Sequence, residues 1–191
     1  MRLRDLLRRV RHLPDRLLHA RRREASVARV RAVRPVRSVL FVCLGNINRS
    51  AYASAALRKL TDGRIRVSSA GFIGPGRRVP ERSREVARRR GVDLSDHESR
   101  LVTAGLAAEV DLVVVMDRSQ RRQVRALGDC RVELLGDFDP DPIETRMVRD
   151  PWGQPSAVAD AVFARIDRCL EVLVEAITEG GASPGVIGPS R

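Results

Sequence analysis

A cysteine and an arginine separated by five residues are the residues of this chain best suited to chemistry. Cys43 is followed by Leu44, Gly45, Asn46, Ile47 and Asn48, and then by Arg49 and Ser50. A short loop between a strand and a helix can direct successive backbone N–H groups toward one point and so bind an anion. The following helix adds partial positive charge at its N-terminus, and Arg49 can hold a tetrahedral oxyanion through two parallel hydrogen bonds. A thiol in such a loop is held as the thiolate, so the pattern predicts a cysteine nucleophile placed to attack phosphorus.

The residues around Cys43 predict the strand and the helix that this loop needs. Residues 39–43 form a short apolar run rich in β-formers, typical of a buried parallel strand. Residues 49–60 have the Ala- and Leu-rich pattern of a helix. Further segments predict three strands, at 64–70, 110–117 and 131–136, and three helices, at 80–91, 118–128 and 156–177. This alternation indicates an α/β fold, a doubly wound three-layer arrangement around a four-stranded parallel sheet, with ligands bound at the carboxyl ends of the strands.

The positive charge of the chain is concentrated at its N-terminal end. Lys and Arg number 36 against 24 Asp and Glu, a net charge of +12 with neutral His, and residues 1–37 hold 13 of the arginines with only three acidic residues. Between these arginines, apolar residues recur at helical spacing: Leu3, Leu6, Leu7, Val10, Leu13, Leu17 and Leu18. The pattern is typical of a basic amphipathic helix that binds an anionic membrane surface or an acidic partner. The alternative is an Arg-rich extension that packs locally or stays disordered.

Composition excludes several classes of function. No apolar run approaches the roughly 18–20 residues of a membrane span, and Arg recurs too often near the N-terminus for a secretory signal. Cys43, Cys130 and Cys169 are far apart and form no CxxC pair, so we expect no metal site and no disulfide framework. Sparse thiols indicate a cytoplasmic protein, peripheral at the inner membrane face if the extension binds lipid. Aromatic residues make up only 3%, so nucleic acid is not an expected partner.

Residues 39–50, VLFVCLGNINRS, resemble the active-site loop of the low-molecular-weight protein tyrosine phosphatases. Three later segments resemble further motifs of that family in the same order, VSSAGF at 67–72, VDLVVVMDRSQ at 110–120 and RDPWG at 149–153. The resemblance therefore covers residues 38–178, with the basic extension 1–37 before it and a tail at 179–191 that we expect to be disordered. It implies a phosphatase-type anion loop, hydrolysis of phosphotyrosine in proteins, and no cofactor. The implied partners are phosphotyrosine proteins and a tyrosine kinase.

The resemblance also implies a role for each matching residue of the loop. Cys43 would be the nucleophile that forms a cysteinyl-phosphate intermediate. Arg49 would bind the phosphoryl oxygens, together with the rest of the loop from Leu44 to Ser50. Asn46 would hold the loop in shape, and Ser50 would donate to the Cys43 thiolate and assist its departure.

A late aspartate would complete the reaction. Asp150 would be the general acid toward the leaving phenol and then the base toward water, and Trp152 would wall the slot for the substrate ring. Asp-Pro also occurs at Asp139 and Asp141, as is common in turns, but only Asp150 is followed by an aromatic residue and then by the last predicted helix. Asp117 is expected to cap a helix rather than to react.

Three other functions stay open on the sequence. A relative of the same fold reduces arsenate through additional cysteines close together in sequence, whereas Cys130 and Cys169 are widely separated and are expected to be structural. A branch that hydrolyses phosphoarginine typically has Thr where this chain has Ile47, which matches the tyrosine-specific pattern. The third is a catalytically weak binding module that acts through its basic extension. The sequence suggests no partner for His97, and three positions depart from the common family pattern: Asn48, Ala51 and Ser54.

Overall fold

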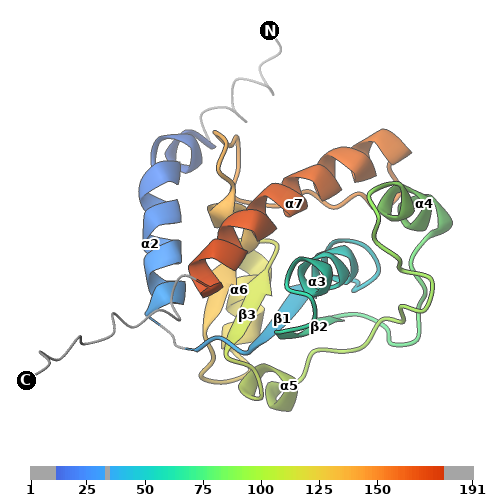
Figure 1. Cartoon of the computed structure of the whole chain (residues 1–191), viewed down its shortest axis with the longest axis horizontal. Coiled ribbons are helices and arrows are strands. Elements are labelled where there is room, and N and C mark those ends of the chain that lie inside the picture. The colour runs from blue at the N-terminus through green and yellow to red at the C-terminus, as the bar shows by residue number, and fades with distance from the viewer. Residues whose placement is uncertain (1–11, 33–34, 179–191) are drawn as a thin grey trace, which may run out of the picture.

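A four-stranded parallel sheet forms the centre of the fold. The structure, a computed structural model, describes residues 12–32 and 35–178 (Figure 1). The strands lie in the order β2-β1-β3-β4, and their bounds are β1 Ser38–Cys43, β2 Arg66–Gly71, β3 Leu112–Val115 and β4 Val132–Leu134. Every residue of β1 is buried, as expected for a central strand covered on both faces. The predicted doubly wound α/β sheet is confirmed.

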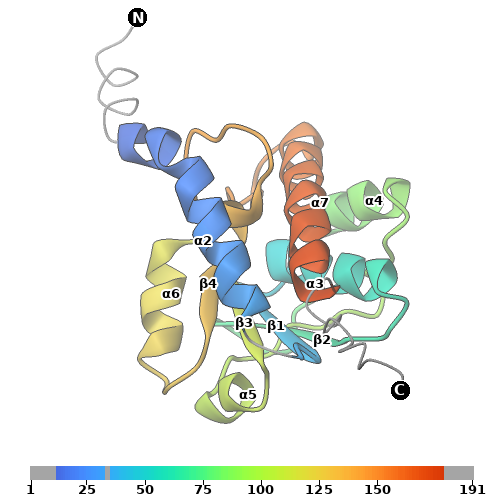
Figure 2. The ribbon, with the colours of Figure 1, turned by 60° about the vertical axis from the view of Figure 1, so that its left-hand side comes forward.

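Helices cover both faces of the sheet and make three layers (Figure 2). One face carries α2 (His19–Arg31), α3 (Arg49–Leu60), α4 (Glu81–Arg89) and α7 (Ser156–Thr178), and the other carries α5 (Ala104–Ala108) and α6 (Arg118–Arg125). Successive residues of a strand point to opposite faces. Phe41 and Cys43 accordingly join the apolar cluster under α3 and α7, whereas Leu40 and Val42 join the cluster under α6. This is why β1 is apolar without interruption.

The structure corrects several predicted ends and adds two short helices. β3 is shorter than the predicted 110–117, and the helix predicted at 80–91 begins only after Pro80. β4 stops at Leu134 because the 3-10 helix η1 (Leu135–Phe138) follows it, and there Gly136 lies so near the Arg146 carbonyl that an added Cβ would be 2.2 Å away. The five-residue helix α5 is absent from the sequence prediction.

The described part of the N-terminal extension is folded against the rest of the chain. Ser26 and Val30 of α2 are buried on the side that faces α7 and η1. Glu133 of β4 accepts hydrogen bonds from Ser26 Oγ at 3.2 Å and from Arg29 Nε at 2.5 Å. The helical pattern expected here does form a helix, but three of its leucines are exposed: Leu13, Leu17 and Leu18. The remaining apolar positions of that pattern, at 3, 6, 7 and 10, and the tail 179–191 lie outside the described residues.

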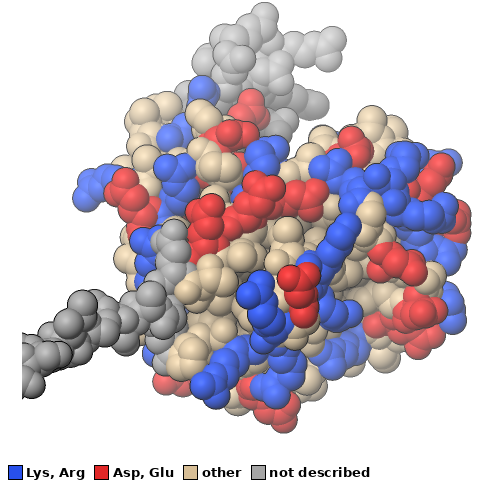
Figure 3. Space-filling view, in the orientation of Figure 1, with Lys and Arg blue, Asp and Glu red and all other residues tan. Residues whose placement is uncertain are grey.

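Charge outside the extension is nearly balanced. Residues 38–191 hold 23 basic and 21 acidic residues. Figure 3 shows the two signs interspersed over one face of the molecule, with a group of acidic side chains along α7. Within residues 12–32 and 35–178, no helix combines the length and the apolar character that crossing a membrane requires.

Candidate active site

Cys43 lies at the carboxyl end of β1, in the loop that leads into α3. The Asn46 backbone N–H donates to Cys43 Sγ at 3.2 Å, and Ser50 Oγ lies 3.0 Å from the same sulfur. Only 2% of the Cys43 surface is exposed. Hydrogen-bonding groups from the loop and from the first turn of α3 therefore contact the sulfur.

Asn46 uses all of its hydrogen-bonding groups to hold this loop. Besides the bond from its N–H to Cys43, its Nδ2 donates to Ser50 Oγ at 2.9 Å and its Oδ1 accepts from the Arg100 backbone N–H at 2.9 Å. Its carbonyl oxygen accepts from His97 Nε2 at 2.7 Å. Its φ of 52° lies in the left-handed region, where Asn is enriched. Because Ser50 Oγ accepts from Asn46, the Ser50 hydroxyl hydrogen is available to the sulfur of Cys43.

The end of β2 supports the outer side of the same loop. The backbone N–H groups of Phe72 and Ile73 both donate to the Leu44 carbonyl, at 2.8 and 3.2 Å. Gly71 permits this approach, since an added Cβ would lie 2.8 Å from both the Asn46 nitrogen and the Leu44 oxygen. The Leu44 carbonyl is thus turned out of the loop, as a cradle of inward N–H groups requires.

Arg49 and Asp150 form an ion pair at the edge of this loop. Arg49 Nη2 donates to Asp150 Oδ2, and Nη1 donates to the Val148 carbonyl at 3.0 Å. The Val148 N–H in turn donates to the Met116 carbonyl at 2.9 Å, which ties this segment to the end of β3. The Arg49 side chain is 4% exposed and that of Asp150 39%. Asp150 is therefore the accessible partner, and an entering anion can replace it on Arg49.

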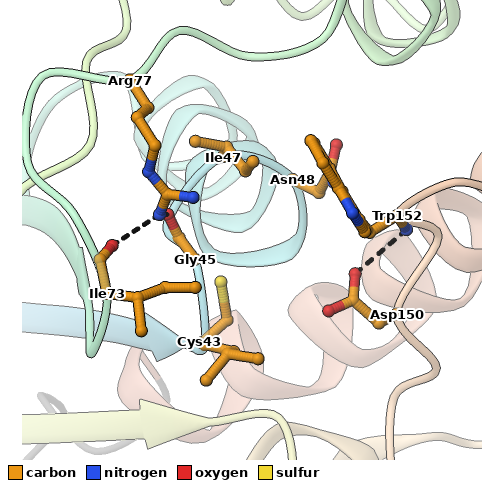
Figure 4. A pocket seen from close by; sticks show the side chains of 9 residues that line it. Cys43, Gly45, Ile47, Asn48, Ile73, Arg77, Asp150 and Trp152 are labelled. Atoms are coloured by element: carbon orange, nitrogen blue, oxygen red, sulfur yellow. Dashed lines mark hydrogen bonds between the residues drawn. The ribbon is translucent and has the colours of Figure 1, made fainter.

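A pocket of about 240 Å³ opens above Cys43. Figure 4 shows the Cys43 sulfur pointing into it, with Ile73 and Arg77 on one side and Asp150 and Trp152 on the other. The backbone N–H of Trp152 donates to Asp150 Oδ1 at 3.2 Å, which holds the carboxyl group of Asp150 close to Trp152. The floor of the pocket is polar and its sides are largely apolar, a combination that suits a flat aromatic group carrying an anion.

The predicted site residues converge on this pocket. Cys43, Asp150 and Trp152 line it together with four loop residues, Leu44, Gly45, Ile47 and Asn48. The other predicted residues, Asn46, Arg49 and Ser50, contact Cys43 or Asp150 through the bonds described above.

The other aspartates considered as the acid lie elsewhere. Asp139 is 1% exposed and is bonded to Arg165 Nε at 2.8 Å, and Asp141 pairs with Arg168 at 2.9 Å. Neither lines the pocket. Asp117 caps α6, as predicted, because its side chain accepts from the Gln120 N–H at 2.8 Å.

The two remaining cysteines are also separate from the pocket. Burial raises the pKa of the Cys169 thiol and, more weakly, that of Cys130. Both are free thiols, Cys169 fully buried on α7 and Cys130 partly exposed before β4. Among the residues that the structure describes, no cluster of three or more His, Cys, Asp or Glu side chains could hold a metal ion.

Two residues of the site carry no signal in the sequence. Arg77 Nη2 donates to the Gly45 carbonyl at 2.6 Å, and its Nε donates to the Gly74 carbonyl at 3.1 Å, so its guanidinium group braces the loop from the pocket wall. His97, without an expected partner, donates to Asn46 from a position 51 residues farther along the chain. Burial is the main cause that lowers its pKa, so the ring is neutral near neutral pH, with its proton on Nε2.

Comparison with known proteins identifies the family. The sequence model of the low molecular weight phosphotyrosine protein phosphatases matches residues 38–182. The chain belongs to this family. The human low molecular weight phosphotyrosine protein phosphatase is 33% identical over 157 residues, which cover 75% of this chain and 98% of the human protein.

Solved structures with the same fold include enzymes of two specificities. The phosphatase matches the tyrosine phosphatase amsI of Erwinia amylovora with a TM-score of 0.69 and 26% identity, over 75% of this chain and 94% of that one. It matches DARP, the Drosophila arginine phosphatase, with a TM-score of 0.67 and 25% identity, over 73% of this chain and 97% of that one. The family confirms an enzyme, a protein phosphatase that hydrolyses phosphoric monoesters.

Proposed function

We propose that this phosphatase hydrolyses phosphotyrosine in proteins through a cysteinyl-phosphate intermediate. The observation that carries the proposal is the convergence of Cys43, Arg49 and Asp150 at one pocket whose sides include Ile47 and Trp152. A protein tyrosine kinase would produce its substrates.

In the first step the phosphate group enters the loop and takes the place of Asp150 on Arg49, and the released Asp150 carboxylate takes up a proton from solvent. The Cys43 thiolate attacks phosphorus, so an S–P bond forms while the bond from phosphorus to the phenol oxygen breaks. The electron pair stays on the phenol oxygen, which receives the proton of Asp150. Loop N–H groups and the Arg49 guanidinium stabilise the charge that develops on the phosphoryl oxygens.

In the second step water replaces the sulfur on phosphorus. Asp150, now a carboxylate, takes a proton from the water as its oxygen bonds to phosphorus. The S–P bond breaks and its electron pair returns to Cys43. The Ser50 hydroxyl, 3.0 Å from that sulfur, donates to the departing thiolate and makes it a better leaving group. Inorganic phosphate then leaves, Asp150 releases its proton to solvent, and Arg49 can return to the Asp150 carboxylate.

Tyrosine is favoured as the substrate residue because of what surrounds the pocket. Leu44, Ile73 and Trp152 are large apolar side chains left 45%, 47% and 61% exposed around it, and a phosphotyrosine ring would cover them. Ile47 is buried to 6% exposure in the pocket wall, where its branched carbon chain offers no hydrogen-bond acceptor to a guanidinium group. A phosphoarginine side chain would leave its N–H donors unpaired against this wall.

A comparison of two phosphopeptides tests this assignment. Peptides of one sequence carrying phosphotyrosine or phosphoarginine are given to the wild-type enzyme and to Ile47→Thr, and phosphate release is measured. We expect the wild type to prefer phosphotyrosine and Ile47→Thr to shift the ratio of kcat/KM toward phosphoarginine. A wild-type preference for phosphoarginine would overturn the tyrosine assignment.

Trapping of the intermediate tests the mechanism. Acid quenching during turnover of a ³²P-labelled phosphotyrosine peptide should leave labelled wild-type protein, and Cys43→Ala should leave none. Cys130→Ser is the matched control, because Cys130 is a partly exposed free thiol outside the pocket. Label that persists in Cys43→Ala would exclude a Cys43 intermediate.

A further inference from the structure

Residues 12–21, the N-terminal helical segment, bury two polar side chains and leave their leucines exposed. Asp15 is 8% exposed and His19 5%, whereas Leu17 is 72% exposed. A surface helix ordinarily does the reverse, with the apolar stripe on the core and the charged residues in water. The inversion leaves an apolar face without a partner among the described residues.

Polar contacts fix this orientation. Asp15 Oδ1 accepts from Arg22 at 2.9 Å and from Arg118 at 2.6 Å, and the His19 Nε2 is bonded to the Asp139 carbonyl at 2.8 Å. Rolling the segment to bury its leucines would break these bonds and leave Asp15 unpaired. The outward direction of the leucines therefore belongs to the folded state.

The outward side chains combine apolar and basic character. Leu13, Leu17 and Leu18 are 46%, 72% and 39% exposed, and Arg16 and Arg21 are exposed beside them. We call the exposed side chains of residues 13, 16, 17, 18 and 21 the outer face. Of the other exposed large apolar side chains, Leu44, Ile73 and Trp152 line the pocket and are explained by the substrate ring, whereas Leu60, Leu101 and Met147 do not line it.

The sequence before the outer face continues its pattern. Apolar residues at 3, 6, 10, 13 and 17 alternate in steps of three and four, and residues 1–18 hold six Arg against two Asp. Leucines beside arginines match a bilayer surface, where acyl chains receive the leucines and anionic headgroups attract the arginines. We propose that the outer face binds an anionic phospholipid membrane. A second copy of the chain is disfavoured as its occupant, because it would bring two strongly basic segments together.

Membrane binding here would act on the catalytic side of the fold. Asp15 accepts a hydrogen bond from Arg118, the first residue of α6. It also accepts a weak one, at 3.4 Å, from the backbone N–H of Arg146, which lies in the segment that leads to Asp150. Both arginines lie beyond the carboxyl ends of the strands, and Cys43 is the last residue of β1 at the same edge of the sheet. Figures 1 and 2 show the start of the N-terminal helical segment beside the segment between η1 and α7, which contains Arg146. The pocket of the membrane-bound enzyme would then lie close to phosphoproteins at the membrane surface.

Vesicle sedimentation with the full-length protein tests the proposal. The vesicles are phosphatidylcholine alone or phosphatidylcholine mixed with phosphatidylglycerol. We expect wild-type protein to sediment with the anionic vesicles only, and less at high salt. Leu17→Gln with Leu18→Gln should lower the partition coefficient roughly tenfold or more, because the leucines supply the apolar burial. Arg16→Gln with Arg21→Gln should lower it by about fivefold for each arginine.

The matched control is Leu60→Gln with Leu101→Gln, two leucines 44% and 42% exposed elsewhere on the surface. It should bind vesicles as the wild type does, and all variants should keep the wild-type rate on p-nitrophenyl phosphate in solution, which reports an intact fold and pocket. Absent binding to anionic vesicles, or undiminished binding by the Leu17/Leu18 variant, would overturn the proposal. So would a dimer in light scattering that this variant abolishes, since the outer face would then bind a second copy.

Discussion

The variant Asp150→Asn removes the acidic proton at this position but keeps an oxygen that can accept a hydrogen bond from Arg49. The asparagine oxygen can still accept from Arg49 Nη2, and the change leaves the size of the side chain almost the same, so the melting temperature should stay near that of the wild type. General acid catalysis contributes about 10²–10⁴ in rate. The Asp150 side chain is 39% exposed in the unliganded pocket, so water can partly supply the missing proton. We therefore expect a loss at the lower end, about 10²-fold or about 2.7 kcal/mol, when the leaving group is a phenol.

The assay compares leaving groups under single-turnover conditions. Phenyl phosphate needs a proton on its departing oxygen and should show the full loss in Asp150→Asn. The p-nitrophenolate leaving group is stable as an anion, so its loss should be less than about tenfold. Asp141→Asn, in another Asp-Pro pair of the same segment, is the matched control and should behave as wild type with both substrates. Equal losses for the two substrates would refute Asp150 as the proton donor.

Three further perturbations act through contacts around Cys43. Ser50→Ala removes a hydrogen bond to the sulfur, of the kind worth about 1.5–3 kcal/mol to a charged group, so kcat should fall about 10–150-fold; an unchanged kcat in stopped-flow assays would contradict the role given to its hydroxyl. Arg77→Met frees the Gly45 carbonyl and should lower kcat/KM by roughly tenfold, whereas wild-type kinetics would show that the loop needs no such brace. Burial holds the His97 pKa below its usual 6.5, so the unfolded chain binds this proton more readily, and the free energy of unfolding should fall as the pH drops below about 6.5. Urea unfolding at several pH values should show a smaller fall in this free energy for His97→Gln than for the wild type. An equal fall would exclude His97 as its source.

The sequence predicts the parts of this site that are local in the chain. An apolar run followed by Cys43, the loop and Arg49 predicts a strand, a short loop and a helix within a dozen residues, and the structure has all three. Asp150 is predicted as the acid because an aromatic residue and a helix follow it at short range. These features depend on neighbours in sequence, whose geometry the backbone fixes.

Contacts between distant segments explain what the sequence does not predict. His97 reaches Asn46 across 51 residues and Arg77 reaches Gly45 across 32, and neither residue type at its position distinguishes a site residue from a solvated one. The segment 139–155 forms neither a helix nor a strand. Its order comes from ion pairs such as Asp139 with Arg165, which appear only once α7 packs beside it.

The sequence leaves open which way the leucines of the N-terminal helix face. Periodicity shows that leucines share one side of this segment, and ordinary packing would turn that side inward. The partners that reverse it, Arg118 for Asp15 and Asp139 for His19, lie more than 100 residues away. Only the tertiary structure decides which side faces water.

The ion pair between α2 and β4 joins the part of the chain that the family shares to a helix that precedes it. The family match begins at residue 38, yet Glu133, 5% exposed, is neutralised by Arg29 from before that boundary. A fragment that begins at residue 38 would lack Arg29 and Val30. The Glu133 carboxylate would lose this ion-pair partner, and the apolar surface that Val30 covers would be exposed to water. Exchanging β4 of this enzyme for that of a relative would therefore also require a matching partner for Arg29 of α2.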